Sequence, residues 1–195
     1  MKPLLLTAVL LGLVAVLEAQ DALSEGQEFQ GIWYIKAMVS DKVMPEDKRP
    51  YKMFPLTVTA LEGGDLEATV VFWKKGQCRE IKIVMKKSDR PGEYTAFNGK
   101  KTIYIQKLPV GDHYLLYCEG EHHGKWFRKG KLMGRDPEEN PEALEEFKKF
   151  TQLRGFSQKN IIVPEQSGDT GTGNCTVSSV LVEENKHTAT WCPYT

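Results

Sequence analysis

Hydrophobic and polar residues alternate along most of the chain between residues 30 and 134. A period of two, rich in β-branched and aromatic residues, predicts β-strands with one buried face. A polar loop at residues 40–50 follows the first run, and short turns rather than helices connect the others. The predicted strands cover residues 30–39, 54–61, 66–73, 78–87, 93–97, 101–107, 112–119 and 125–134. Eight consecutive hairpin-connected strands predict an all-β protein, either an antiparallel up-and-down barrel or a sandwich.

The alternation also predicts which side chains share the inner face of this sheet. They are almost all apolar: Ile35, Leu56, Val58, Ala68, Val70, Phe72, Ile81, Ile83, Met85, Ile103, Ile105, Tyr114, Leu116 and Cys118. An eight-stranded barrel has room either for a core filled by its own side chains or for one small ligand. The pattern alone leaves both alternatives open.

The periodicity changes after residue 134 and predicts one helix. Asn140 is a suitable N-cap, Pro141 suits the first helical position, and Gly155 suits the end. The expected apolar stripe consists of Leu144, Phe147, Phe150 or Thr151, and Leu153. A single helix after eight strands must pack this stripe on the outside of the sheet. Residues 167–195 are rich in Gly, Ser, Thr and charge, which predicts a polar, loosely ordered tail.

The first 19 residues have the pattern of a secretory signal peptide. Lys2 is followed by an apolar run over residues 4–17, and Ala19 offers a small residue for cleavage. We therefore expect a secreted, extracellular protein whose barrel and helix occupy residues 20–166. Lys+Arg and Asp+Glu both number 26, so no excess charge suggests a nucleic acid as partner. No later stretch is long and apolar enough to predict membrane insertion.

Four cysteines remain in this oxidising compartment: Cys78, Cys118, Cys175 and Cys192. Four cysteines allow three complete pairings, and their spacing does not choose among them. Cys118 lies within a predicted strand, where we expect a buried free thiol, and Cys192 has no evident partner. The adjacent histidines His122 and His123 suit a turn better than a metal site, so we expect no metal and no cofactor.

Three short blocks carry a resemblance to a known family. Gly31 and Trp33 open the first strand, Asp112-His113-Tyr114 opens the seventh, and Gly134-Arg135 closes the last. In this order, and with a helix following, they resemble the three signature blocks of the lipocalins. Longer stretches, among them residues 33–38 and 61–68, are similar to the branch that contains tear lipocalin and the odorant-binding proteins.

The resemblance implies an eight-stranded calyx with a C-terminal helix packed outside. It implies that Arg135 lies over the face of Trp33 and that a disulfide joins Cys78 to Cys175. By the same resemblance, the protein is not an enzyme but a secreted carrier of small hydrophobic molecules, such as odorants, fatty acids and other lipids. Lys131 resembles an interior lysine of this branch, where it would meet a polar ligand head; otherwise it is an ordinary exposed lysine.

Two other functions are open to a protein of this pattern. One is a secreted inhibitor or a lipocalin that binds a cell-surface receptor, with the loops at residues 40–50 and 89–92 as an open-end contact surface. The other is a lipocalin-type isomerase with Cys118 as nucleophile. The isomerase is disfavoured because no base accompanies the cysteine in the sequence.

Overall fold

The computed structural model describes residues 27–43, 52–74, 77–122, 124–166 and 177–182. The predicted signal peptide, Cys175 and Cys192 lie outside these residues, as do the side chains of Phe72 and Cys78. The strands of the main sheet are β1 (Gly31–Ser40), β3 (Leu56–Ala60), β4 (Leu66–Lys74), β5 (Gln77–Lys87), β6 (Glu93–Ala96), β7 (Lys101–Lys107), β8 (His113–His122), β9 (Lys125–Gly134) and β11 (Val177–Val182).

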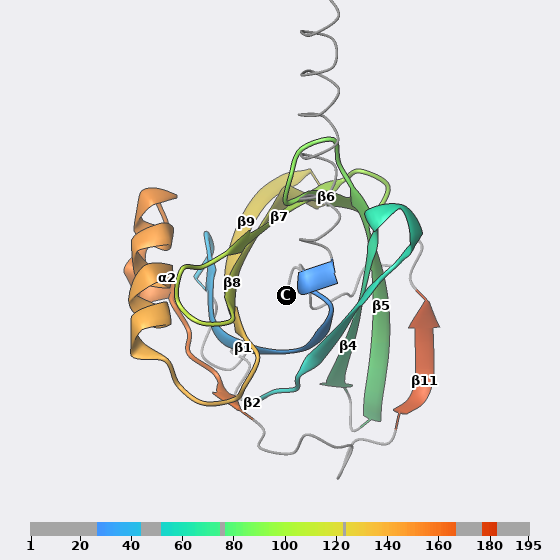
Figure 1. Cartoon of the computed structure of the whole chain (residues 1–195), viewed down its shortest axis with the longest axis horizontal. Coiled ribbons are helices and arrows are strands. Elements are labelled where there is room, and N and C mark those ends of the chain that lie inside the picture. Colours follow the sequence, from blue (N-terminus) through green and yellow to red (C-terminus); the bar gives the residue numbers. More distant parts are fainter. Residues whose placement is uncertain (1–26, 44–51, 75–76, 123, 167–176, 183–195) are drawn as a thin grey trace, which may run out of the picture.

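Eight of these strands close into an antiparallel barrel, which Figure 1 shows end-on. Their order is β5-β4-β3-β1-β9-β8-β7-β6, and β6 returns to β5 through the pairs Lys86–Thr95 and Lys87–Tyr94. Each strand therefore lies beside its neighbours in sequence, except where β1 meets β9 to close the ring. The prediction of an eight-stranded antiparallel barrel with one helix outside is confirmed.

A bulge in β1 changes which residues face the interior. The register against β9 shifts between Ile35 and Ala37, so that Lys36 is the extra residue. Before the bulge, Trp33 and Ile35 belong to the interior cluster; after it, Met38 packs there. Ala37 and Val39 belong instead to a second cluster on the outside of the barrel. A bulge adds one residue and therefore reverses the alternation of faces.

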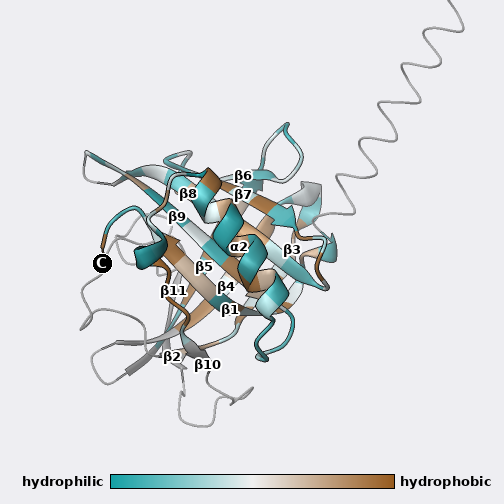
Figure 2. Cartoon of the chain, turned by 90° about the vertical axis from the view of Figure 1, so that its left-hand side faces the viewer, coloured by the Kyte–Doolittle hydropathy of each residue, from teal (hydrophilic) through white to brown (hydrophobic). Residues whose placement is uncertain are grey.

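The helix α2 (Pro141–Leu153) covers this outer cluster. Asn140 caps it by accepting a hydrogen bond from the backbone N–H of Ala143. The buried face consists of Ala143, Phe147 and Thr151, whereas Leu153 is 88% exposed. The expected stripe was thus wrong at its last residue, because the contact ends before the final turn. Figure 2 shows α2 lying across the outside of the sheet with hydrophilic residues facing outward.

Several pairings bring the segments after α2 back to the barrel. Ile162 forms an isolated antiparallel bridge with Met38, and β10 (Glu165–Gln166) pairs with β2 (Lys52–Met53) in parallel. In the segment expected to be a loosely ordered tail, β11 runs parallel to β5, with Val177 opposite Cys78 and Val182 opposite Lys82. This last segment is the strand at the far right of Figure 1.

The register also assigns the turns to the two ends of the barrel. Gly31 pairs with Val58, and Ala60 pairs with Leu66, which lies opposite Met85 near the end of β5. The turn at residues 89–92, which follows β5, is therefore at the same end as Gly31. Ser40 lies at the other end of β1. The expectation that residues 40–50 and 89–92 form one open-end surface was wrong.

Candidate functional site

Aromatic residues and one arginine seal the end of the barrel where β1 begins. Trp33 is fully buried, stacks on Phe29 at 4.9 Å between ring centroids, and donates a 2.7 Å hydrogen bond from Nε1 to the carbonyl oxygen of Phe29. The guanidinium of Arg135 lies 3.7 Å from the centroid of the Trp33 ring. The expected cation–π contact is therefore present, in a geometry that is stabilising for an arginine over an indole.

Backbone carbonyls hold Arg135 in this place. Its Nη1 donates to the carbonyl of Gln30 at 2.8 Å, and its Nη2 donates to that of Glu28 at 2.7 Å. Gly31 has φ +113°, and a Cβ there would lie 2.6 Å from Nη1 of Arg135. Both the backbone conformation and the close approach require glycine at this position. The first signature block and the last thus form one structural unit, which closes this end.

Lys36 and His113, the latter from the block Asp112-His113-Tyr114, make further contacts at the same end. Lys36 is 7% exposed, and its Nζ donates to Oδ1 of Asp136 at 2.7 Å and to the carbonyl oxygen of Glu138. The Nδ1 of His113 lies 3.0 Å from the carbonyl oxygen of Val110. Burial, followed by the charge of Lys36, lowers the pKa of His113 below its usual value. A neutral imidazole here is a packing residue of the sealed end.

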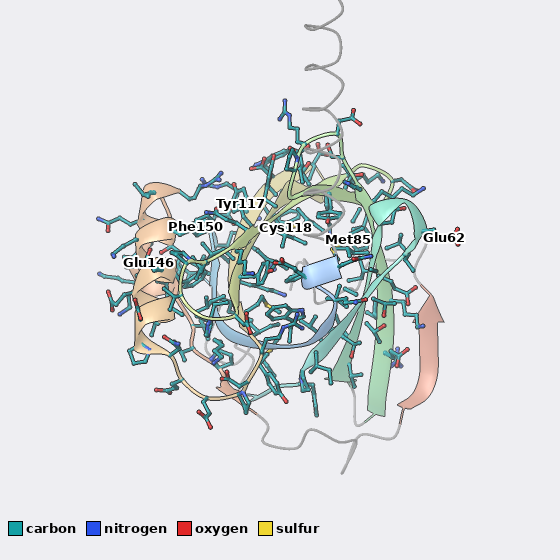
Figure 3. All side chains as sticks on the ribbon, in the orientation of Figure 1. Glu62, Met85, Tyr117, Cys118, Glu146 and Phe150 are labelled. Atoms are coloured by element: carbon teal, nitrogen blue, oxygen red, sulfur yellow. The ribbon has the colours of Figure 1, made fainter. Side chains whose placement is uncertain are left out.

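Inside the barrel, side chains from all eight strands form one apolar cluster. Most of the predicted inward residues belong to it: Ile35, Leu56, Val58, Ala68, Val70, Ile81, Ile83, Met85, Ile103, Tyr114, Leu116 and Cys118. Ile105 is only partly buried and packs against its edge. Figure 3 shows the same division: Met85 and Cys118 lie inside the ring, whereas Tyr117 and Phe150 lie between the ring and α2.

Three lysines interrupt this apolar interior. Lys131 is 7% exposed and lies directly opposite Leu116 and Met38. Lys129 lies opposite Cys118 and belongs to the same face of β9. Directly opposed residues in an antiparallel pair share a face of the sheet, and Leu116, Met38 and Cys118 all pack inside. The register therefore places both lysines on the inner wall.

The third lysine, Lys101, was missed in the sequence. It is 7% exposed, opposite Ala96 and Gly120, with Nζ 4.0 Å from the centroid of Phe97 and 5.5 Å from that of Phe127. The sequence did contain a signal for it: residues two apart on a strand face the same side, and Lys101 is two residues before the inward Ile103. It was overlooked because a lysine at the start of a strand is usually exposed.

The low polarity of this interior changes the charge of its lysines. Burial, and to a smaller extent the charge of Lys129, lowers the pKa of Lys131 to about 7. Burial, followed by the charge of Lys101, lowers the pKa of Lys129 to about 8. Desolvation disfavours the ammonium form, and neighbouring cations disfavour it further. The inner wall therefore holds amines that gain or lose a proton near neutral pH.

Cys118 is not a free thiol. It is 7% exposed in the interior cluster, but it is disulfide-bonded, and the described residues contain no free cysteine. The expectation of a buried thiol was wrong because it used spacing along one strand, and spacing carries no information on which distant segment reaches that strand. A disulfide sulfur is not a thiolate nucleophile, so the candidate isomerase residue is lost.

Within the described part of the chain, no group of three or more His, Cys, Asp or Glu side chains is arranged to hold a metal ion. None of the helices described there is long and apolar enough to cross a membrane.

A closed antiparallel barrel, sealed at one end and apolar inside, is the architecture of a β-barrel calyx. A model of the lipocalin / cytosolic fatty-acid binding protein family matches residues 30–168. The chain belongs to the lipocalin family.

Curated relatives are similar over nearly their whole length. Odorant-binding protein 2a of Mus musculus is 54% identical over 167 residues, which cover 85% of this chain and 95% of that protein. Lipocalin-1 of Sus scrofa is 50% identical over 166 residues, which cover 84% of this chain and 93% of that protein. Vomeronasal secretory protein 1 of Mus musculus is 43% identical over 158 residues, which cover 79% of this chain and 84% of that protein.

Proposed function

We propose that this protein is a secreted carrier of small hydrophobic molecules, which it holds inside the barrel. The observation that carries the proposal is the inner wall itself, where apolar side chains from all eight strands form one cluster while one end is sealed. Transfer of an apolar ligand from water into such an interior is favourable by about 0.8 kcal/mol per buried CH₂ group. The names of the relatives point the same way, since one is an odorant-binding protein.

Secretion is part of this proposal. Residues 1–19 have the pattern of a signal peptide, and one relative is named a secretory protein. The disulfide at Cys118 adds an independent argument, because disulfides persist in oxidising compartments.

The interior lysines support one kind of ligand over others. A long apolar body suits the wall formed by residues such as Ile81, Ile103 and Leu116. A carboxylate or carbonyl oxygen at one end of the ligand suits the amines of Lys129 and Lys131, since hydrogen bonds that involve a charged group are among the stronger ones. We therefore expect amphiphilic ligands with a single polar head to bind more tightly than alkanes of equal length.

The experiment is a titration of mature protein with an environment-sensitive apolar fluorophore. We expect saturable binding at micromolar concentrations. Leu116→Trp, which enlarges a side chain that is 3% exposed on the inner wall, should weaken binding while the protein stays folded. Val84→Trp is the matched control, because Val84 lies on the same barrel but is 43% exposed. Absence of saturable binding by any apolar probe would contradict the carrier function.

A further inference from the structure

One cation and two aromatic rings meet inside the barrel at the end opposite the sealed one. Phe97 follows β6, which begins beside the turn at residues 89–92 of the sealed end, so Phe97 lies at the other end. Phe127 is near the start of β9, the strand that runs from there to Arg135. The Nζ of Lys101 lies 4.0 Å from the ring centroid of Phe97 and 5.5 Å from that of Phe127. We call these three residues the mouth cluster.

The mouth cluster belongs to the inner wall. Lys101 is 7% exposed, Phe127 is 1% exposed, and Phe97 is partly buried against the interior cluster. Lys101 is opposite Gly120, which is itself opposite Phe127, so these residues form one row across β7, β8 and β9. A Cβ at Gly120 would lie 3.2 Å from Cγ of Lys101. The lysine side chain therefore passes over the bare backbone of β8 on its way to Phe127.

The backbone of the turn before Lys101 is strained. Phe97 has φ +55° and Asn98 has φ +56°. The left-handed region is tolerated by asparagine but is an outlier for a bulky aromatic residue. Such a conformation persists only where the surrounding structure holds it, and it is frequent at ligand clamps and switch regions. At Phe97 the strain favours a change of the turn, whereas the cation–π contact with Lys101 opposes it.

The mouth cluster lies between solvent and the proposed ligand site. Ile103 is two residues beyond Lys101 on the same strand and opposite Cys118, and both belong to the interior cluster. A ligand that enters at this end passes the mouth cluster before it reaches Ile103. The other end is closed by Trp33 and Arg135.

We propose that Phe97 and Lys101 form a gate that controls how fast a ligand enters and leaves the barrel. The gate is closed while the ring of Phe97 rests on the ammonium of Lys101, and it opens when this contact breaks and the strained turn relaxes. This inference rests on the proposed function, because it concerns the passage of the ligand to its site.

A gate of this kind has a kinetic signature. If it closes over the empty and the occupied barrel alike, breaking the cation–π contact is part of the barrier in both directions. Loss of the contact then raises the association and dissociation rates together and leaves the affinity unchanged. A residue that instead contacts the bound ligand changes the affinity, mostly through the dissociation rate.

The test is stopped-flow binding of an uncharged apolar fluorophore to the mature protein. Lys101→Met roughly keeps the length of the side chain and removes its charge, and Phe97→Gly removes the ring at a φ that glycine readily adopts. We expect each variant to raise both rates about tenfold, which corresponds to about 1.4 kcal/mol, and to keep the Kd within about twofold of the parent. The double variant should be no faster than either single variant, because all three lack the same contact.

Lys100→Met is the matched control, since Lys100 is the exposed neighbour of Lys101 and should leave both rates unchanged. Urea denaturation shows which variants are folded, and either single variant alone decides the question. Saturable binding with unchanged rates in folded Lys101→Met or Phe97→Gly would overturn the gate. So would a weaker affinity with an unchanged association rate, because Lys101 would then be a ligand contact. Absence of saturable binding in the parent would instead refute the carrier function, and the gate with it.

Discussion

A lysine inside an apolar barrel contributes a free energy that depends on pH. The pKa of Lys131 is lowered to about 7 by burial and then by Lys129, well below the value of 10.5 for an unfolded chain. Between pH 7 and pH 10.5 the unfolded state binds more protons than the folded state, so the free energy of unfolding rises with pH. The destabilisation caused by burying the charge of Lys131 is therefore greatest below about pH 7. Replacement of Lys131 should therefore stabilise the protein more at pH 6 than at pH 10.

The same shift predicts proton uptake when an anionic ligand binds. At pH 8 Lys131 is mostly neutral, and a carboxylate beside it would favour the ammonium form. A long-chain carboxylate should take up close to one proton per site, whereas an alcohol of equal length should take up almost none. Isothermal titration calorimetry in buffers with different ionisation enthalpies measures this number.

The controls for this prediction are two lysine variants. Lys131→Met should abolish most of the uptake. Lys82→Met should leave it unchanged, because Lys82 pairs with Glu67 at 3.3 Å on the outside of β5. Equal uptake in the parent and in Lys131→Met would show that the carboxylate does not meet Lys131.

At the scale of elements, the residues at the start of α2 are enough to specify where this helix begins. Asn140 and Pro141 are recognisable without any tertiary information, and Oδ1 of Asn140 accepts from the N–H of Ala143 at 3.0 Å. The bulge in β1 has no such local signal. Lys36 is the extra residue because its ammonium turns towards Asp136 and Glu138, which follow β9 about a hundred residues later.

Removal of the helix cap should lower the stability of the protein by a small but measurable amount. We expect Asn140→Ala to lower the free energy of unfolding by about 1 kcal/mol, since an N–H in the first turn loses its acceptor. Ser157→Ala is the control, because Ser157 precedes the short helix η3 (Gln158–Asn160) without a side-chain cap hydrogen bond. Chemical denaturation of both variants compares them, and an equal loss would contradict the role of the cap.

At the scale of the whole molecule, the barrel wall separates two apolar clusters. The inner cluster contains the proposed ligand site, and the outer one lies beneath α2. Phe147 belongs to the outer cluster and is fully buried. The two sides of the wall should therefore affect stability and binding differently.

Phe147→Ala should lower the free energy of unfolding by about 3–5 kcal/mol, because it leaves a cavity beneath the helix. The affinity for the fluorophore should stay within about twofold of the parent at temperatures where the variant is folded, because distant sites are usually energetically independent. Leu153→Ala is the matched control, since Leu153 lies on the same helix but is 88% exposed. Urea denaturation and probe titration measure the two effects, and a large loss of affinity in folded Phe147→Ala would contradict their separation.

Much of this protein follows from short-range patterns in the sequence. Alternation from Leu56 to Val70 and from Ile81 to Met85 is a direct consequence of strand geometry, and the residues at both ends of these two stretches belong to the interior cluster. Trp33 and Arg135 were recognised as partners because the pattern of blocks carries the family resemblance. The start of the helix was also predicted from a short-range pattern, because its cap depends on residues only three positions apart, Asn140 and Ala143.

Only the tertiary structure decided the features that depend on residues distant in sequence. The bulge at Lys36 and the position of the turn at residues 89–92 both follow from registers between strands. The disulfide at Cys118 depends on a partner from another part of the chain. The pKa values of Lys129 and Lys131 depend on desolvation by the entire barrel. Periodicity describes one strand at a time, whereas these properties arise from the packing of several strands together.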